Sequence, residues 1–156
     1  MKRWYLWVGL LALGLLAFAA GGMAEDLWKT LSESRYATNW HYIPGKPPGF
    51  YKGTEPHGAV LRTFVNNIAY DAIQAKAGGY PDGAVIVKEN YAPDGKKLGA
   101  ITVMKKVKGY DPEHGDWFWA KYGPDGRVQA SGKVASCIAC HGRAKAQDYV
   151  FSTSIK

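Results

Sequence analysis

The feature that most constrains this fold is a Pro-Asp-Gly triplet that occurs three times, at residues 81–83, 93–95 and 124–126. Each triplet favours a tight turn, because proline fixes its own φ angle and glycine accepts a left-handed backbone conformation. Between the triplets, apolar and polar side chains alternate as in half-buried strands. The predicted strands are residues 59–66, 84–91, 98–107, 116–123 and 127–130. Short strands joined by tight turns predict an antiparallel β-meander.

Helical patterns flank the predicted sheet. Residues 26–38 place apolar side chains at helical spacing, residues 67–77 read as a short helix that a Gly-Gly pair stops, and a third helix is predicted over 137–146. Residues 39–58 form a long Pro/Gly loop rich in aromatic side chains, and loops of this length are often functional. The predicted fold class is α+β, an antiparallel β-meander sheet with a few short helices. The alternating strands exclude a four-helix bundle.

The N-terminus reads as a targeting segment. Lys2 and Arg3 precede an uncharged, Leu/Ala-rich run over 4–24 that ends in small residues. This pattern is typical of a secretory signal peptide, residues 1–24, cleaved after Ala24. The alternative is a membrane anchor, since the uncharged run is long enough to span a bilayer. The prediction is an exported, periplasmic protein with one mature domain, residues 25–156.

The net charge and the distribution of the basic residues indicate which kinds of partner the chain can bind. The 156-residue chain has a formal net charge of +7, and most of its basic residues are separated by acidic ones. Nucleic-acid binding proteins gather basic side chains into a stripe with interleaved aromatics, which this chain lacks, so no nucleic acid partner is expected. A redox partner protein with an acidic surface is a better match to a mildly basic chain.

The two cysteines of the chain carry its clearest chemistry. Cys137, Cys140 and His141 form a C-x-x-C-H motif, which is typical of c-type heme attachment. Both thiols can reach one edge of a heme, and the adjacent histidine supplies the proximal iron ligand. A zinc site needs four ligands, and the sequence has no second cysteine pair. A redox dithiol normally sits at an early strand–helix junction. The motif therefore predicts one covalently bound heme c, with His141 as the metal ligand.

The second axial position decides what such a heme does. Only fifteen residues follow His141, and they include neither Met nor His, so a distal ligand has to come from upstream. The candidates are His41, His57, His114, Met104 and the lysines. His41 and His57 flank the Pro/Gly loop and are interpreted as loop histidines, and His114 as an exposed turn residue. Met104 is either a core residue or the ligand.

The sequence resembles the cytochrome P-460 family, which includes the cytochromes c′-beta. The resemblance covers nearly all of the mature chain and rests on residues 61–73, 80–91, 115–128 and 137–152. It implies a β-sheet domain that carries one heme c and forms a homodimer. In this family the cytochromes P-460 oxidise hydroxylamine with a heme cross-linked to a lysine. The cytochromes c′-beta bind nitric oxide or carbon monoxide under a cap of aromatic side chains.

The resemblance also implies roles for single residues. Lys88 matches the cross-linking lysine, although the residues themselves favour a structural role or a pairing with a heme propionate. Arg62 matches a distal-pocket arginine, and Phe64 would share its face and cap the distal side. The catalytic members also carry a distal carboxylate, whose position falls within 100–104, where there is no Asp or Glu. Without that base, hydroxylamine oxidation is expected to be poor.

Three functions remain open from the sequence. The favoured one is binding of a small gaseous or nitrogen-oxide ligand, such as NO or CO, at an open distal site. The second is electron transfer through a six-coordinate heme with Met104 or a histidine on the iron. The third is an enzyme, a hydroxylamine-oxidising oxidoreductase with a Lys88–heme cross-link.

Overall fold

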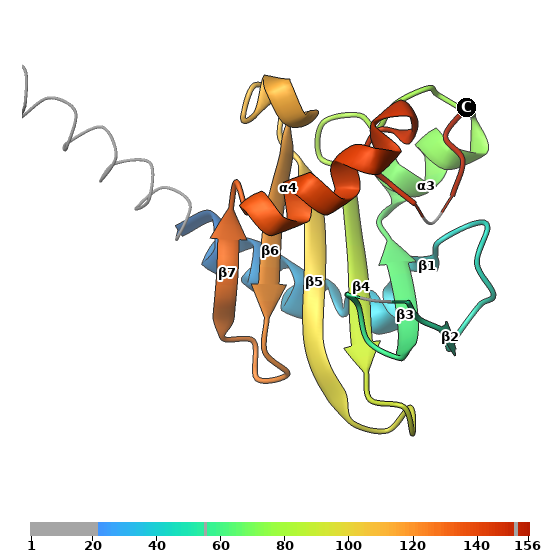
Figure 1. Cartoon of the computed structure of the whole chain (residues 1–156), viewed down its shortest axis with the longest axis vertical. Helices are drawn as coiled ribbons and strands as arrows, with labels where there is room; N and C mark the ends of the chain where they lie inside the picture. The colour runs from blue at the N-terminus through green and yellow to red at the C-terminus, as the bar shows by residue number, and fades with distance from the viewer. Residues whose placement is uncertain (1–21, 55, 152) are drawn as a thin grey trace, which may run out of the picture.

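The fold is an antiparallel sheet with helices on both faces. The computed structural model describes residues 22–54, 56–151 and 153–156. In Figure 1, helix α4 crosses in front of the sheet while the N-terminal helical segment, residues 22–34, runs behind it. The α+β class predicted from the sequence is therefore confirmed.

The sheet has seven strands in the order β1-β3-β4-β5-β6-β7, and β2 also pairs with β3. All pairings are antiparallel. The strands are β1 (His41–Tyr42), β2 (Tyr51–Lys52), β3 (Val60–Val65), β4 (Val85–Tyr91), β5 (Leu98–Lys106), β6 (Trp117–Tyr122) and β7 (Val128–Gly132). The predicted meander is confirmed from β3 onward. The predicted loop 39–58 additionally contributes β1 and β2, which pair along the outer edge of β3.

The helices are short. Helix α3 (Asn67–Gln74) begins where the Asn66 side chain accepts a hydrogen bond from the Ala69 amide. The others are α2 (Tyr36–Asn39), η1 (Pro112–His114), α4 (Ala135–His141) and η2 (Gly142–Gln147). The helix predicted over 26–38 is wrong as one element. Arg35, with a φ angle of 47°, separates the segment 22–34 from α2 because a left-handed residue ends a helical run.

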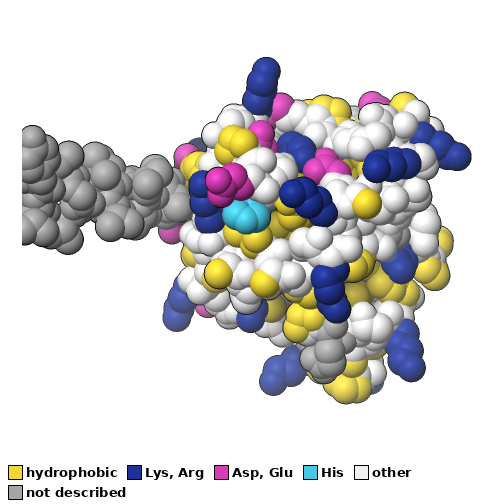
Figure 2. Space-filling view, turned by 45° about the horizontal axis from the view of Figure 1, so that its top comes forward, with side chains coloured by type: hydrophobic (Ala, Val, Ile, Leu, Met, Phe, Trp, Pro, Cys, Tyr) yellow, Lys and Arg dark blue, Asp and Glu magenta, His cyan; other side chains and the backbone are white. Residues whose placement is uncertain are grey.

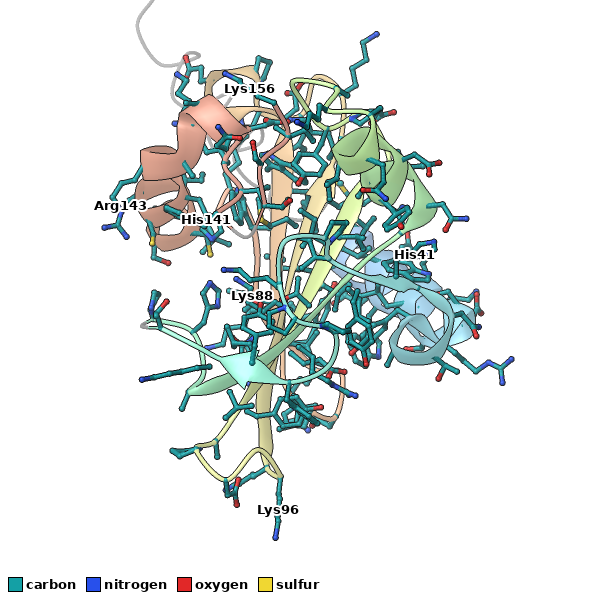
Figure 3. All side chains as sticks on the ribbon, turned by 90° about the vertical axis from the view of Figure 1, so that its right-hand side faces the viewer. His41, Lys88, Lys96, His141, Arg143 and Lys156 are labelled. Carbon is teal, nitrogen blue, oxygen red and sulfur yellow. The ribbon has the colours of Figure 1, made fainter. Side chains whose placement is uncertain are left out.

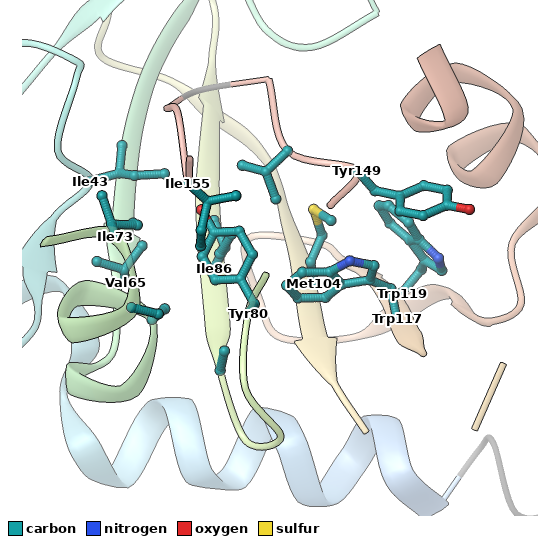
Figure 4. Packing of buried hydrophobic residues seen from close by; sticks show 14 residues of the cluster. Ile43, Val65, Ile73, Tyr80, Ile86, Met104, Trp117, Trp119, Tyr149 and Ile155 are labelled. Atoms are coloured by element: carbon teal, nitrogen blue, oxygen red, sulfur yellow. The ribbon is translucent and has the colours of Figure 1, made fainter. Parts of the chain in front are cut away.

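Two hydrophobic clusters lie on opposite faces of the sheet. One contains Ile86, Met104 and Trp119 and packs beneath α3, α4 and the C-terminal residues (Figure 4). The other contains Val87 and Phe118 and packs beneath the segment 22–34. Because successive side chains of a strand point to opposite faces, β4 contributes to both clusters. The face beneath α4 is the one that positions the C-x-x-C-H motif.

The predicted cleavage site falls inside the N-terminal helical segment. Ala24 is fully buried, and its carbonyl oxygen accepts a 2.7 Å hydrogen bond from the Tyr122 hydroxyl. Residues 1–21, most of the predicted signal peptide, lie outside the described residues. Within the residues that are described, no helix has the length and apolar character needed to cross a membrane.

Candidate functional site

The C-x-x-C-H motif lies on α4. Cys137 and Cys140 are half-buried three positions apart, and His141 is 9% exposed at the end of the helix. The His141 Nδ1 atom lies 2.7 Å from the Tyr149 carbonyl oxygen. A carbonyl can only accept a hydrogen bond, so Nδ1 carries the proton and Nε2 keeps its lone pair. This is the usual arrangement of a metal-binding histidine, whose second nitrogen donates to the protein.

Three cavities adjoin His141 and the cysteines. One of about 290 Å³ is lined by Cys140 and His141, among others. A second, of about 50 Å³, is lined by Cys137 and His141, and a third, of about 640 Å³, by Cys137. All three have His57 in their walls. The motif therefore faces cavities that lie between α4, the sheet and the loop that carries His57.

Lys88 projects from β4 into this space. It lines two of the cavities, and Figure 3 shows its side chain directed toward the region below His141. Burial is the main cause that lowers the pKa of Lys88 to about 8. Among the described residues, its ammonium makes no hydrogen bond or ion pair. Withdrawing a cation from water without a partner is costly, even where it is half-buried as here, so the position suits a ligand that supplies an acceptor or a negative charge.

The walls around His141 are aromatic. The His141 ring centroid lies 4.8 Å from that of Trp119 and 5.5 Å from that of Phe151. Trp119 Nε1 is buried and has no hydrogen-bond partner within the described part of the chain. A heme is a flat apolar ring system with carboxylates at one edge. Aromatic walls, an unpartnered indole N–H and the Lys88 ammonium therefore fit this group.

His57, one of the candidate distal ligands that the sequence analysis interpreted as a loop histidine, lies at the site. Its ring centroid lies 6.2 Å from that of His141, and its Nδ1 lies 3.1 Å from the Asn90 Oδ1. The only signal in the sequence was the length of the loop that contains it. His41 is far from the site, bonded to Asn67 on the other side of the molecule (Figure 3). His114 is bonded to Asp111 in the turn before β6.

Met104, on β5 of the sheet, also lines one of these cavities. It is 8% exposed and lies opposite Ile86 on β4 and Trp119 on β6. Figure 4 shows it packed beside Trp119 within the hydrophobic cluster. It lines the smallest cavity together with His141. The structure therefore brings Met104 to the site as a wall residue of the core.

Arg62 and Phe64 lie on the opposite face of the sheet, which corrects their expected place at the distal side. Arg62 donates to Glu89 over 2.7 Å and to the Tyr91 hydroxyl over 3.0 Å. Phe64 is 1% exposed and packs against the Tyr36 ring beneath the N-terminal helical segment. The reason is register: Arg62 pairs with Glu89 across the β3–β4 ladder, so it shares the face of Glu89 rather than that of Lys88.

The residues that surround the site are basic. No Asp or Glu occurs among the described residues that line the three cavities. Besides Lys88, the linings contain Lys46, Lys52, Lys97, Lys121 and Arg143. Figure 2 shows the Lys and Arg side chains of one face standing apart from each other rather than forming a stripe. Among the described residues, the linings of these cavities therefore present basic rather than acidic side chains.

The comparisons with known proteins agree with this site. A search of curated proteins finds no match. The family model described as Cytochrome P460 matches residues 28–152, which include the whole sheet and the C-x-x-C-H helix. The match covers most of the chain, and a heme is the group that its site residues fit. The chain belongs to the cytochrome P460 family.

Proposed function

We propose that this protein is a monoheme c-type cytochrome, with thioether bonds at Cys137 and Cys140 and His141 as the proximal ligand. The observation that carries this proposal is the Nδ1–H bond of His141 to the Tyr149 carbonyl, which leaves Nε2 for a metal beside the cavities that both cysteines line. When bound, the heme supplies an iron that takes up small ligands or single electrons.

The test is a double Cys137→Ser, Cys140→Ser variant produced together with heme maturation machinery. Purified wild-type protein should carry one covalent heme by intact mass and by its pyridine hemochrome spectrum. The double variant should lose covalent heme in both measurements. Covalent heme retained in the double variant would exclude the attachment proposed here.

The function we infer for this heme is reversible binding of a small gaseous ligand, NO or CO, on the side opposite His141. Its support is a pocket in which polar groups, Lys88 and His57, interrupt largely apolar walls. Hydroxylamine oxidation needs a group that accepts protons, and the described lining contains no carboxylate. The reduced protein should change its Soret band on adding CO or NO, and hydroxylamine should give little turnover.

Two alternatives have an observation of their own. Electron transfer to an acidic partner is favoured by the basic residues around the cavities, Lys46, Lys52 and Arg143. A hydroxylamine oxidoreductase would carry a Lys88–heme cross-link. Lys88 favours this alternative because a pKa near 8 leaves part of its amine neutral and nucleophilic, as formation of the cross-link requires. A peptide containing Lys88 with heme attached would favour the enzyme. A reduced protein that binds neither CO nor NO would favour electron transfer.

We also propose export after cleavage at Ala24 and assembly as a homodimer. The support for export is the sequence of residues 1–24, and the C-x-x-C-H motif agrees with it. Mass analysis of periplasmic protein should give a chain that starts at Glu25. The homodimer rests on family resemblance, and sedimentation of the holoprotein tests it.

A further inference from the structure

The loop between β2 and β3 holds a histidine against the proposed heme site. The Gly53 amide donates to the Ala59 carbonyl over 2.8 Å, and the His57 amide donates to the Thr54 carbonyl over 3.1 Å. A Cβ atom on Gly58 would lie 2.7 Å from the Tyr91 carbonyl oxygen, so only glycine lets the loop approach β4 this closely. These contacts fix where His57 leaves the backbone.

Asn90 determines which nitrogen of His57 carries the proton. The Asn90 Nδ2 group donates to the Lys88 carbonyl, the Ala100 carbonyl and Thr102 Oγ1, over 2.9, 3.2 and 3.2 Å. The Asn90 Oδ1 atom therefore faces His57 and, as an acceptor, requires a proton on Nδ1 over the 3.1 Å contact. The Nε2 atom of His57 keeps its lone pair. His57 thus has the same protonation pattern as His141.

The spacing of the two histidines matches a shared metal ion. Their ring centroids are 6.2 Å apart and their ring planes are inclined by 85°. Two imidazoles on opposite sides of one metal ion, each with a nitrogen about 2 Å from it, have ring centroids roughly 6 Å apart. His57 is half-buried, and its Nδ1–H bond to Asn90 leaves the lone pair of Nε2 free, as a metal ligand requires. Met104, in contrast, is packed into the core.

We propose that His57 is the second axial ligand of the heme, opposite His141, and that a small ligand binds only by displacing it. This proposal rests on the heme c site proposed above. It replaces an open distal position by one that the His57 side chain closes. For a small ligand to bind, the His57 ring has to leave the iron. This requires either that its hydrogen bond to Asn90 break or that the backbone around His57 move.

The holoprotein tests this by its spin state. Wild-type ferric protein should be low-spin by absorption and electron paramagnetic resonance, without a sulfur-to-iron charge-transfer band. His57→Ala should be high-spin, and added imidazole should restore the low-spin spectrum. His41→Ala is the matched control, because His41 is an exposed histidine with one side-chain hydrogen bond, and its spectrum should equal that of wild type. CO should bind reduced His57→Ala at least about tenfold more tightly than wild type, since the competing ligand is gone.

The outcomes separate this proposal from the proposed function. A high-spin wild-type protein that binds CO would overturn the role of His57 and leave gas binding intact. A low-spin spectrum that survives in His57→Ala and is lost in Met104→Ala would also overturn it, with Met104 as the ligand. Loss of the low-spin spectrum in His57→Ala without any CO or NO binding would support His57 and reject gas binding. If His57→Ala fails to fold, a sulfur-to-iron band in wild type still decides against His57.

Discussion

Two neighbouring residues of β4, the buried Glu89 and the half-buried Lys88, carry charges in opposite situations. Glu89 is 4% exposed and accepts hydrogen bonds from the Tyr36 hydroxyl over 2.9 Å, the Arg62 Nε over 2.7 Å and the Tyr91 hydroxyl over 2.8 Å. Lys88 points to the other face, toward His141, and its ammonium has no such partner among the described residues. One strand therefore carries a carboxylate that the chain satisfies and a cation that it leaves unsatisfied.

This contrast indicates a structural role for Glu89 and a binding role for Lys88. A buried charge is tolerated when hydrogen bonds and an opposite charge replace its water, as they do for Glu89. The face beneath α4 can also pair a lysine: Lys106 lies 2.7 Å from Asp148 and donates to the Gly115 carbonyl. Lys88, which lines the same cavities as His141, has no such partner among the described residues. We interpret it as a cation kept for a bound group.

The largest effect is expected from breaking the satisfied charge. Glu89→Ala leaves the Arg62 guanidinium and two tyrosine hydroxyls without their acceptor, so the free energy of unfolding should fall by about 3–5 kcal/mol. Urea denaturation measures this loss. The matched control is Glu33→Ala, whose ion pair with Lys29 is exposed, with side chains 67% and 73% exposed, and it should stay within about 0.5 kcal/mol of wild type. If Glu89→Ala lowered the free energy of unfolding by no more than the control does, the hydrogen bonds of Glu89 would contribute nothing to stability.

A smaller loss is expected at the paired lysine of the other face. Asp148→Ala removes the partner of Lys106 and the acceptor of the Tyr80 amide, which donates over 2.7 Å. The pair is less buried than Glu89, with side chains 13% and 14% exposed. The free energy of unfolding should therefore fall by about 2–3 kcal/mol. Asp148→Asn, which keeps an acceptor oxygen, should recover part of this loss in the same measurement, and equal losses in both variants would contradict the account.

The sequence was sufficient for the parts of this contrast that depend on local pattern. Turn triplets and alternation placed β3 to β7, and the motif spacing placed Cys137, Cys140 and His141. Alternation also grouped Lys88 with Ile86 and Asn90, as observed. It could not tell which face of β3 looks toward α4, because apolar residues line both faces and one step of register exchanges them. The family resemblance placed Arg62 at the distal side and Phe64 on the same face, and alternation gave no means of correcting this; both lie behind the site.

The place of His57 beside His141 could not be predicted from the sequence, for a different reason. Its place beside His141 depends on the β3–β4 pairing and on the Asn90 side chain, which bring together residues far apart in the chain. A single histidine in a Pro/Gly loop carries no spacing signal that predicts such a contact. The loop's length indicated a functional cover, without indicating which of its residues turns inward.

The smallest expected effect has the opposite sign. In apoprotein, made in the Cys137→Ala, Cys140→Ala background, Lys88→Met should raise the free energy of unfolding by about 1–2 kcal/mol, because it replaces an unpaired half-buried cation by an apolar chain. Urea denaturation measures it. Lys96→Met is the control, since Lys96 is exposed in a turn at the far end of the sheet (Figure 3), and it should leave stability unchanged.

The pH dependence fixes the cause of that gain. The pKa of Lys88 is lowered from 10.5 to about 8 in the folded chain, so between these values the unfolded chain holds a proton that the folded chain has released. The free energy of unfolding of the parent protein should therefore rise with pH across this window. The advantage of Lys88→Met should be full below pH 8 and vanish near pH 10.5. A variant that is instead destabilised, as Glu89→Ala is, would show that Lys88 has a partner within the chain, and the two charges of β4 would then be alike.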